Sequence, residues 1–381
     1  MKINLHHFLV VILCLAVPFC SFSQDDSVTF DAKYIKKHEG KVTIEVNEVQ
    51  ELTYIMMAIS DFAVGNSDML NRDTDYYQAV QHHFSRYKTH PAISLIDSML
   101  TESIINYILL SANAYGFKFD GPNLVATNVY TFPAKQVGTY RISQDPIKRH
   151  RQVFEDFAEQ SDFRKFYRSH KHDYDKIHDD FVNFGAIHKQ KQWLEERFDY
   201  RINSYLVLTS PLIGGINATT TFEDNHFKQT VLYLPTIKFN SDWTPAYGEA
   251  MNSRIIFTEI DHNYVGPLSE QFLGRIDEIF DRREIWVNKA NASTAHYPTP
   301  IKVFDEYLTW GLFILYAYDA FPANVELHRK VIDHVNGKMS DKGFPRAESF
   351  NKKLVELYRG SPSKKIQAIY PDLLDWASTI E

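Results

Sequence analysis

The hydrophobic pattern of the chain changes from mainly helical in the first half to a mixture of strands and helices in the second. In the first half, apolar residues recur every three to four positions, as they do on the buried face of a helix. Helices are predicted over residues 47–64, 74–87, 91–116 and 146–200. Asn47 suits the N-cap of the first helix, and Pro91 suits the first turn of the third. Residues 28–46 alternate around Glu39 and Gly40, which predicts a β-hairpin.

Alternating stretches rich in β-branched residues mark the start of the second half. Strands that pair are predicted over residues 203–222 and 227–239. An apolar helix follows, and Gly266 with Pro267 is expected to end it. Further helices are predicted over residues 268–282, 301–320, 322–337 and 346–360. The pattern favours a mainly helical α+β fold, with a helical N-terminal region over residues 24–200 and a small sheet backed by helices over 201–381. The two regions can form one compact domain.

Residues 1–23 have the features of a secretory signal peptide. Lys2 gives the positive start, "FLVVILCLAV" is a short apolar segment, and Ser21 and Ser23 are the small residues expected before a cleavage site at Gln24. We therefore expect export to the periplasm or the medium. No later segment is apolar for 18 residues, so a stable membrane anchor is not expected.

The amino-acid composition excludes several classes of function. Both cysteines, Cys14 and Cys20, lie in the expected leader, so the exported chain has no disulfide, no thiolate nucleophile and no cysteine–zinc site. Bulky residues before Cys20 also disfavour lipidation there. The formal net charge is −7 at pH 7, which makes nucleic acid a poor partner.

One stretch carries a chemical signal. "RIIFTEIDHNYVGPL", residues 254–268, places Glu259 and His262 one helical turn apart. In the zinc-peptidase motif HExxH, two histidines four positions apart bind Zn²⁺ and the glutamate activates a water. Thr258 stands where the first histidine would be, and a neutral hydroxyl is a weak zinc ligand. The alternative interpretation is an ordinary pair on a helix surface.

A second signal is acidic. Asp305 and Glu306 stand near the start of the largely apolar helix predicted over 301–320. Carboxylates at that position either cap the helix N-terminus or bind something. The sequence leaves both interpretations open.

The chain resembles a family of exported bacterial proteins known as domain of unknown function 4932, which are regarded as zincin-like peptidases. The match is carried by "VQELTYIMMAISDF", "YYQAVQHHFSRYKTHPAI", "SYLVLTSPLIGGINA", "FTEIDHNYVGP" and "FDEYLTWG", and covers roughly residues 45–320. The family pattern resembles HExxHxFxNP, so Glu259, His262 and Pro267 fall on matching positions and Tyr264 falls in the aromatic slot. Glu306 matches the downstream glutamate ligand of a gluzincin.

The resemblance implies a zincin-like, gluzincin-type metallopeptidase fold, a zinc cofactor and a peptide or protein substrate. Glu259 would then be the catalytic base, and His262 and Glu306 would be metal ligands. Beside the site helix, zincins have a strand that pairs with extended substrate. Gly214 and Gly215 suit that close approach, or an ordinary turn.

Thr258 departs from the family pattern, and three outcomes follow. The metal site is inactive, or it recruits another ligand such as His226 or His296. In the third, Glu259 itself binds the metal and leaves Asp261 as the remaining candidate base. The sequence thus predicts an exported zincin-like metallohydrolase with an altered metal site. The alternative is a non-catalytic exported binding protein, a pseudoenzyme that kept the fold.

Overall fold

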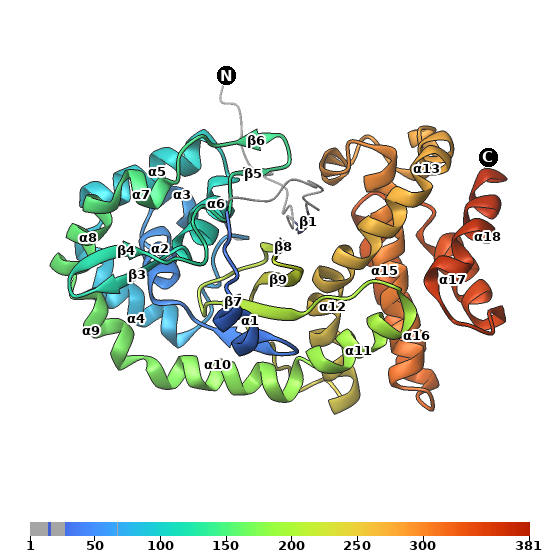
Figure 1. Cartoon of the computed structure of the whole chain (residues 1–381), viewed down its shortest axis with the longest axis horizontal. Coiled ribbons are helices and arrows are strands. Elements are labelled where there is room, and N and C mark those ends of the chain that lie inside the picture. The colour runs from blue at the N-terminus through green and yellow to red at the C-terminus, as the bar shows by residue number, and fades with distance from the viewer. Residues whose placement is uncertain (1–13, 17–26, 67) are drawn as a thin grey trace, which may run out of the picture.

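The computed structural model describes residues 14–16, 27–66 and 68–381, and it is a mainly helical α+β structure, as predicted (Figure 1). The expected leader, residues 1–23, lies outside the described residues except for Cys14–Ala16. Figure 1 shows a central sheet with α2 to α9 on one side and α11 to α18 on the other. One continuous hydrophobic core includes residues from both regions.

The central sheet has five strands in the order β1-β8-β9-β7-β2. The strands are β1 (Cys14–Ala16), β2 (Val42–Glu45), β7 (Ser204–Thr209), β8 (Asn217–Asp224) and β9 (Phe227–Leu234). β9 pairs in parallel with β7 and antiparallel with β8. The predicted strand stretch 203–222 is therefore two strands, β7 and β8, and β9 lies between them. β8 runs opposite to β9, β7 and β2, and β1 pairs with it in parallel.

The hairpin predicted over residues 28–46 is wrong. Ala32–His38 forms a helix, α1, and only β2 is a strand. Phe30, Tyr34 and His38 are spaced by four positions and stack, with ring centroids 5.0 and 4.2 Å apart. This helical period overrides the apparent alternation. β2 pairs in parallel with β7, so the N-terminal region supplies one strand of the sheet.

The predicted N-terminal helices are present, but three of them are interrupted. The elements are α2 (Glu48–Ala58), α3 (Asp61–Val64), α4 (Asp75–Phe84), η1 (Ser85–Tyr87), α5 (Pro91–Glu102), α6 (Asn106–Ala114), α7 (Pro146–Arg149), α8 (Arg151–Gln160), α9 (Phe163–Ser169), α10 (Lys171–Phe184) and α11 (Ile187–Arg197). Asn47 caps α2 and Pro91 begins α5, as predicted. Ser60 caps a new helix after Ala58, and Ser103 is extended, so two of the predicted helices break at serines.

Two short hairpins were not predicted. They are formed by β3 (Phe117–Asp120) with β4 (Asn123–Ala126) and by β5 (Gln136–Val137) with β6 (Tyr140–Arg141).

After β9, the rest of the C-terminal region is helical. They are α12 (Pro245–Ser269), η2 (Glu270–Phe272), α13 (Leu273–Phe280), α14 (Arg283–Trp286), η3 (Ala292–His296), α15 (Pro300–Ala320), α16 (Val325–Asp341), α17 (Ala347–Gly360) and α18 (Ile366–Ser378). The predicted end of α12 at Gly266 and Pro267 is wrong, because the helix continues to Ser269. Pro267 removes a single backbone donor in the last turn, while Val265 and Leu268 are buried beside it.

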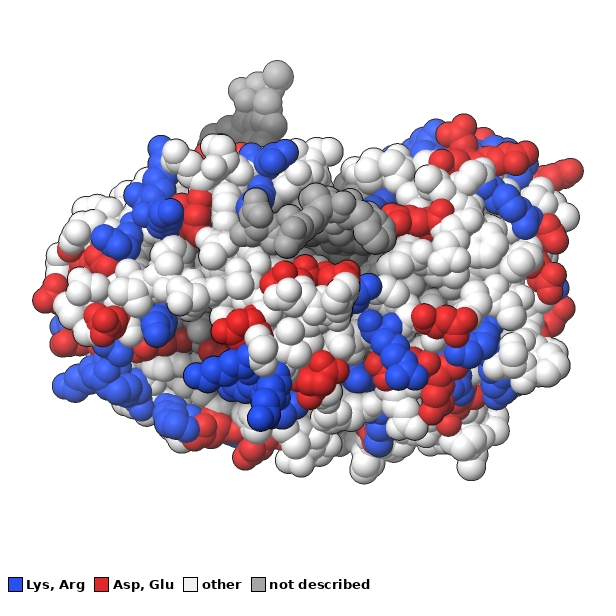
Figure 2. Space-filling view, in the orientation of Figure 1, with Lys and Arg blue, Asp and Glu red and all other residues white. Residues whose placement is uncertain are grey.

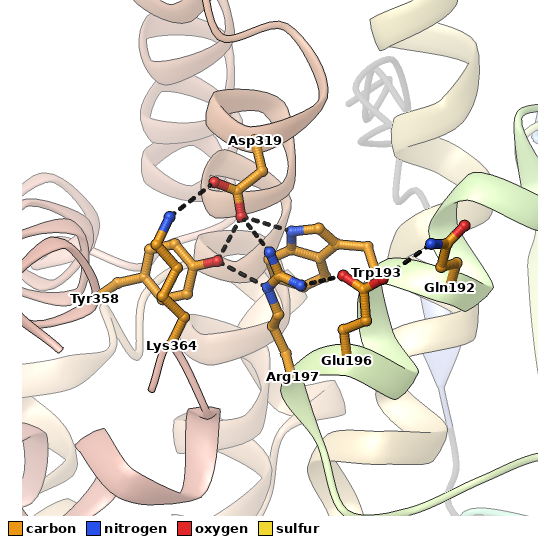
Figure 3. Close-up of polar contacts among 7 residues, drawn as sticks. All are labelled: Gln192, Trp193, Glu196, Arg197, Asp319, Tyr358 and Lys364. Carbon is orange, nitrogen blue, oxygen red and sulfur yellow. Dashed lines mark hydrogen bonds and ion pairs between the residues drawn. The ribbon is translucent and has the colours of Figure 1, made fainter. Parts of the chain in front are cut away.

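A polar cluster fixes the C-terminal end of α15, the helix that also carries the predicted glutamate ligand (Figure 3). Trp193 Nε1 and Arg197 Nη2 of α11 donate to Asp319 Oδ2 at 2.9 and 3.0 Å. Tyr358 of α17 also donates to this oxygen, and Lys364 forms an ion pair with Oδ1 at 3.4 Å. The cluster ties α11, α15 and α17 together.

The face of the molecule in Figure 2 carries interspersed acidic and basic side chains rather than a patch of one sign. Among the described residues, no helix is both long and apolar enough to cross a membrane.

Candidate functional site

The site lies where α12 packs against β8. Glu259 and Asn263 are one turn apart on the face of α12 that meets this strand. Asn217 Nδ2 donates to Glu259 Oε1 at 3.0 Å. Asn263 donates to Thr219 and accepts from Thr221, at 3.0 and 2.7 Å. These bonds fix the helix on the strand and place Glu259 beside the first residue of β8.

His262 and Glu306 lie side by side. His262 Nε2 is 3.9 Å from Glu306 Oε2, and the side chains are 11% and 2% exposed. The interpretation of Glu259 and His262 as a surface pair is therefore wrong.

The capping interpretation of the acidic pair is also wrong. α15 begins at Pro300, its first turn holds no acidic residue, and no side chain caps it. Asp305 and Glu306 are buried further along the helix. The Ser269 hydroxyl donates to Asp305 at 2.5 Å, and burial raises the pKa of this carboxyl to about 7.

Three donors converge on one oxygen of Glu306. The Tyr297 hydroxyl, Trp310 Nε1 and Lys342 Nζ lie 2.8, 2.9 and 3.2 Å from Glu306 Oε1. Lys342 is the C-cap residue of α16, and its ammonium also lies 4.7 Å from the centre of the Trp310 ring. Glu306 therefore has a cation from its own chain on one carboxylate oxygen and His262 on the other.

The surroundings set the protonation of this site. Burial would raise the pKa of Glu306, but Lys342 and then His262 hold it below its ordinary value. Burial lowers the pKa of His262 to about 4, despite the attraction of Glu306. Burial raises the pKa of Glu259 to about 7, opposed by the hydrogen bond from Asn217. At neutral pH, Glu306 is thus anionic, His262 is neutral and Glu259 is partly protonated.

The donor set does not fit the three-ligand zinc centre of a gluzincin. Thr258 Oγ1 donates to the carbonyls of Arg254 and Ile255 at 3.1 and 3.3 Å, so the hydroxyl is used within its own helix. Glu306 already has an ammonium partner. Within the described residues, no group of three or more histidine, cysteine, aspartate or glutamate side chains is arranged to hold a metal ion.

The three weaker candidates lie in different places. His226 is exposed in the β8–β9 turn, at the far end of the strand from Asn217 and about 20 Å away along it. His296 ends η3, directly before Tyr297, and burial and the nearby Lys342 lower its pKa. Asp261 is fully buried. Burial, followed by the nearby Glu259, raises the pKa of Asp261 well above its ordinary value.

The residues expected to contact substrate are used inside the molecule. The nitrogens of Gly214 and Gly215 donate to the carbonyls of Met69 and Asp68 at 3.2 and 2.7 Å, so the close approach is to the chain itself. Tyr264 is fully buried, and its hydroxyl lies 2.8 Å from that of Tyr205. These contacts favour the turn interpretation for the glycines and a core role for Tyr264.

Sequence reasoning missed four residues of the site. Trp310 stands four positions after Glu306, on the same helix face, and this spacing could have shown it. Tyr297, Lys342 and Asn217 come from other elements, and no spacing in the sequence joins them to Glu306 or Glu259.

Comparisons of the chain with protein families, with curated proteins and with solved structures found no match.

Proposed function

We propose that this chain is an exported, zincin-like protein that binds peptide segments in extended conformation and does not cleave them. The relationship between Glu259 and β8 carries the proposal. A buried glutamate on the site helix bonds to the first residue of β8, a strand that runs antiparallel to its neighbour β9. Together with Glu306 on a second helix, this relationship supports the proposal of a zincin-like protein.

The edge of β8 supports the peptide-binding part of the proposal. β9 occupies one side of β8, and residues 14–16 form β1 on the other side, opposite Asn217–Thr219. This edge therefore accepts an extended segment beside Glu259. Cleavage before Gln24, as the sequence predicts, would remove β1 and free the backbone groups of β8 for a peptide strand.

The side chains around Glu306 support the non-catalytic part. A gluzincin centre needs two histidines and a glutamate around one metal. Here Thr258 bonds to its own helix, and Lys342 is paired with Glu306. These two residues leave His262 and Glu306 as an incomplete ligand pair.

One observation favours a hydrolase as the second candidate. Glu259 has a pKa raised to about 7, and its buried Oε2 has no hydrogen-bond partner among the described residues. A carboxylate with that pKa is suited to act as a general base near neutral pH. We therefore keep the altered metallohydrolase as the alternative.

Peptide binding and cleavage in one experiment separate the two functions. A pool of labelled ten-residue peptides is titrated with the protein that begins at Gln24, and anisotropy and mass spectrometry follow binding and cleavage. We expect binding without cleavage, with or without added zinc. N-methylation of the same peptides removes the backbone donors that pair with a strand, so it should abolish binding. Cleavage that Glu259→Gln abolishes would support the hydrolase, and equal binding of the N-methylated peptides would reject the strand site.

A further inference from the structure

Two cations lie against one indole ring at the centre of the site. Lys342 Nζ is 4.7 Å and Arg254 Cζ is 5.1 Å from the centre of the Trp310 ring. Trp310 donates its N–H to Glu306, so the ring, the ammonium and the carboxylate form one buried unit. Such cation–ring contacts are stabilising and fix the cation in place.

Lys342 is held in this position by its helix. It follows α16 directly as the C-cap residue, and its backbone N–H donates to the carbonyls of Lys338 and Ser340. The C-terminal end of a helix carries a partial negative charge, which favours a cation there. The side chain is 13% exposed, so its charge is little screened by solvent.

We propose that Lys342 supplies, from within the chain, the positive charge that a metal ion supplies in a gluzincin centre, and that it thereby excludes divalent cations. The inference rests on the zincin-like fold proposed above and adds the reason for a metal-free centre. The charge balance of Glu306 is satisfied by an ammonium 3.2 Å from Oε1. A divalent cation on the other oxygen of this carboxylate would be repelled by the ammonium that already lies beside it.

The distance between the ammonium and a metal ion bound at this site would make their electrostatic repulsion strong. A metal ion shared by His262 and Glu306 would lie ~2 Å from each ligand atom. The ammonium already lies 3.2 Å from the other oxygen of the same carboxylate, so the two cations would be about 5 Å apart. Repulsion at that separation inside a protein weakens metal binding by orders of magnitude.

Thr258 and Lys342 therefore both weaken metal binding at this site. Thr258 provides no imidazole ligand, and the ammonium supplies positive charge where a metal ion would supply it. A histidine introduced at position 258 alone should give only weak zinc binding, because the repulsion remains. A histidine at 258 together with removal of the ammonium should give a zinc centre made of two histidines and a glutamate.

The test uses the protein expressed with its own leader and purified from the exported fraction. Zinc affinity is measured by competition with a coloured chelator, and bound zinc by metal analysis, for the wild type, Thr258→His, Lys342→Met and Thr258→His/Lys342→Met. We expect no stoichiometric zinc in the wild type or in Lys342→Met, and weak binding in Thr258→His. The double variant should bind one zinc at least about 30-fold more tightly than Thr258→His.

Matched variants separate charge from packing. Thr258→His/Lys342→Arg keeps the charge and should bind like Thr258→His. Thr258→His/Lys342→Gln keeps a donor to Glu306 without charge, and it replaces the methionine variant if that one does not fold. Lys330→Met in the Thr258→His background removes an exposed lysine that pairs with Glu326 on α16, and it should change nothing.

Two results would overturn the inference: stoichiometric zinc in the wild type, or a double variant no tighter than Thr258→His. Peptide binding is measured on the same samples. Its absence, with the zinc result as expected, would reject the proposed function and leave the role of Lys342 standing.

Discussion

Lys342 Nζ lies 3.2 Å from Glu306 Oε1, although 36 positions separate the two residues in the chain. The contact joins the end of α16 to the second turn of α15. It occupies one carboxylate oxygen of Glu306 and leaves the other facing His262 at 3.9 Å. The orientation of the Glu306 carboxylate therefore depends on an ion pair that is almost fully buried.

Replacing only one partner of this ion pair should lower the free energy of unfolding more than replacing both partners. Lys342→Met leaves the Glu306 charge buried without its cation, and we expect a loss of about 3 kcal/mol in the free energy of unfolding. Lys342→Met/Glu306→Gln removes both charges and should recover at least half of that loss. Denaturant unfolding at pH 7 gives the four corners of this cycle. Additive effects of the two substitutions would contradict the coupling.

An exposed pair is the control for the same substitution. Lys353 pairs with Glu356 at 2.8 Å on the surface of α17, where the glutamate side chain is 66% exposed. Lys353→Met should change the free energy of unfolding by less than about 0.5 kcal/mol, because solvent already screens the pair.

Periodicity alone predicted most of the helices, since packing of an apolar face leaves a regular trace in the sequence. It failed where two periods compete. Residues 28–46 alternate in part, but Phe30, Tyr34 and His38 follow a period of four, and Ala32–His38 forms a helix. It also failed at Pro267, where buried neighbours outweigh the loss of one backbone donor.

The candidate centre was predicted only in part. The pairing of His262 with Glu306 followed from the family resemblance rather than from their spacing. Lys342 left no signal, because an isolated lysine near a helix end is ordinary on a protein surface. Only the packing of α16 against α15 brings its ammonium to a buried carboxylate.

Gly214 and Gly215 are adjacent, but only the first should reject a side chain. A Cβ at Gly214 would lie 2.4 Å from the carbonyl oxygen of Asp68, so the backbone would have to move. At Gly215 the nearest atom would be 3.8 Å away, an ordinary contact. We expect Gly214→Ala to destabilise the fold by about 2 kcal/mol and Gly215→Ala by less than about 0.5 kcal/mol. Equal thermal stability of the two variants would show that this turn is not closely packed.

Glu259 should make the fold less stable as the pH rises. Its pKa is raised from 4.5 to about 7 in the folded state, so between these values the folded protein holds the proton more tightly than the unfolded chain. The contribution of protonated Glu259 to the free energy of unfolding is therefore fully present below pH 4.5, and about 3 kcal/mol is lost as the pH rises through 7. Glu259→Gln mimics the protonated form and should be more stable than the wild type at pH 8 and equally stable at pH 4.5. Denaturant unfolding across this range measures the difference, and parallel curves for the two proteins would contradict the raised pKa.

Asp319 should have the opposite pH dependence. Burial would raise its pKa, but the bonds from Tyr358 and Trp193, with Lys364 and Arg197, lower it below the ordinary value of 3.8. The unfolded chain therefore binds the proton first as the pH falls. The contribution of Asp319 to the free energy of unfolding is complete above pH 3.8 and is lost below it. Asp319→Asn should cost about 2 kcal/mol at pH 7, since the amide turns a donor toward at least one of these groups. That cost should shrink as the pH falls below 3.8, whereas Asp333→Asn on the exposed face of α16 should have little effect at any pH. A cost for Asp319→Asn that stays constant down to the lowest pH at which the protein folds would show that the carboxylate charge does not hold α11, α15 and α17 together.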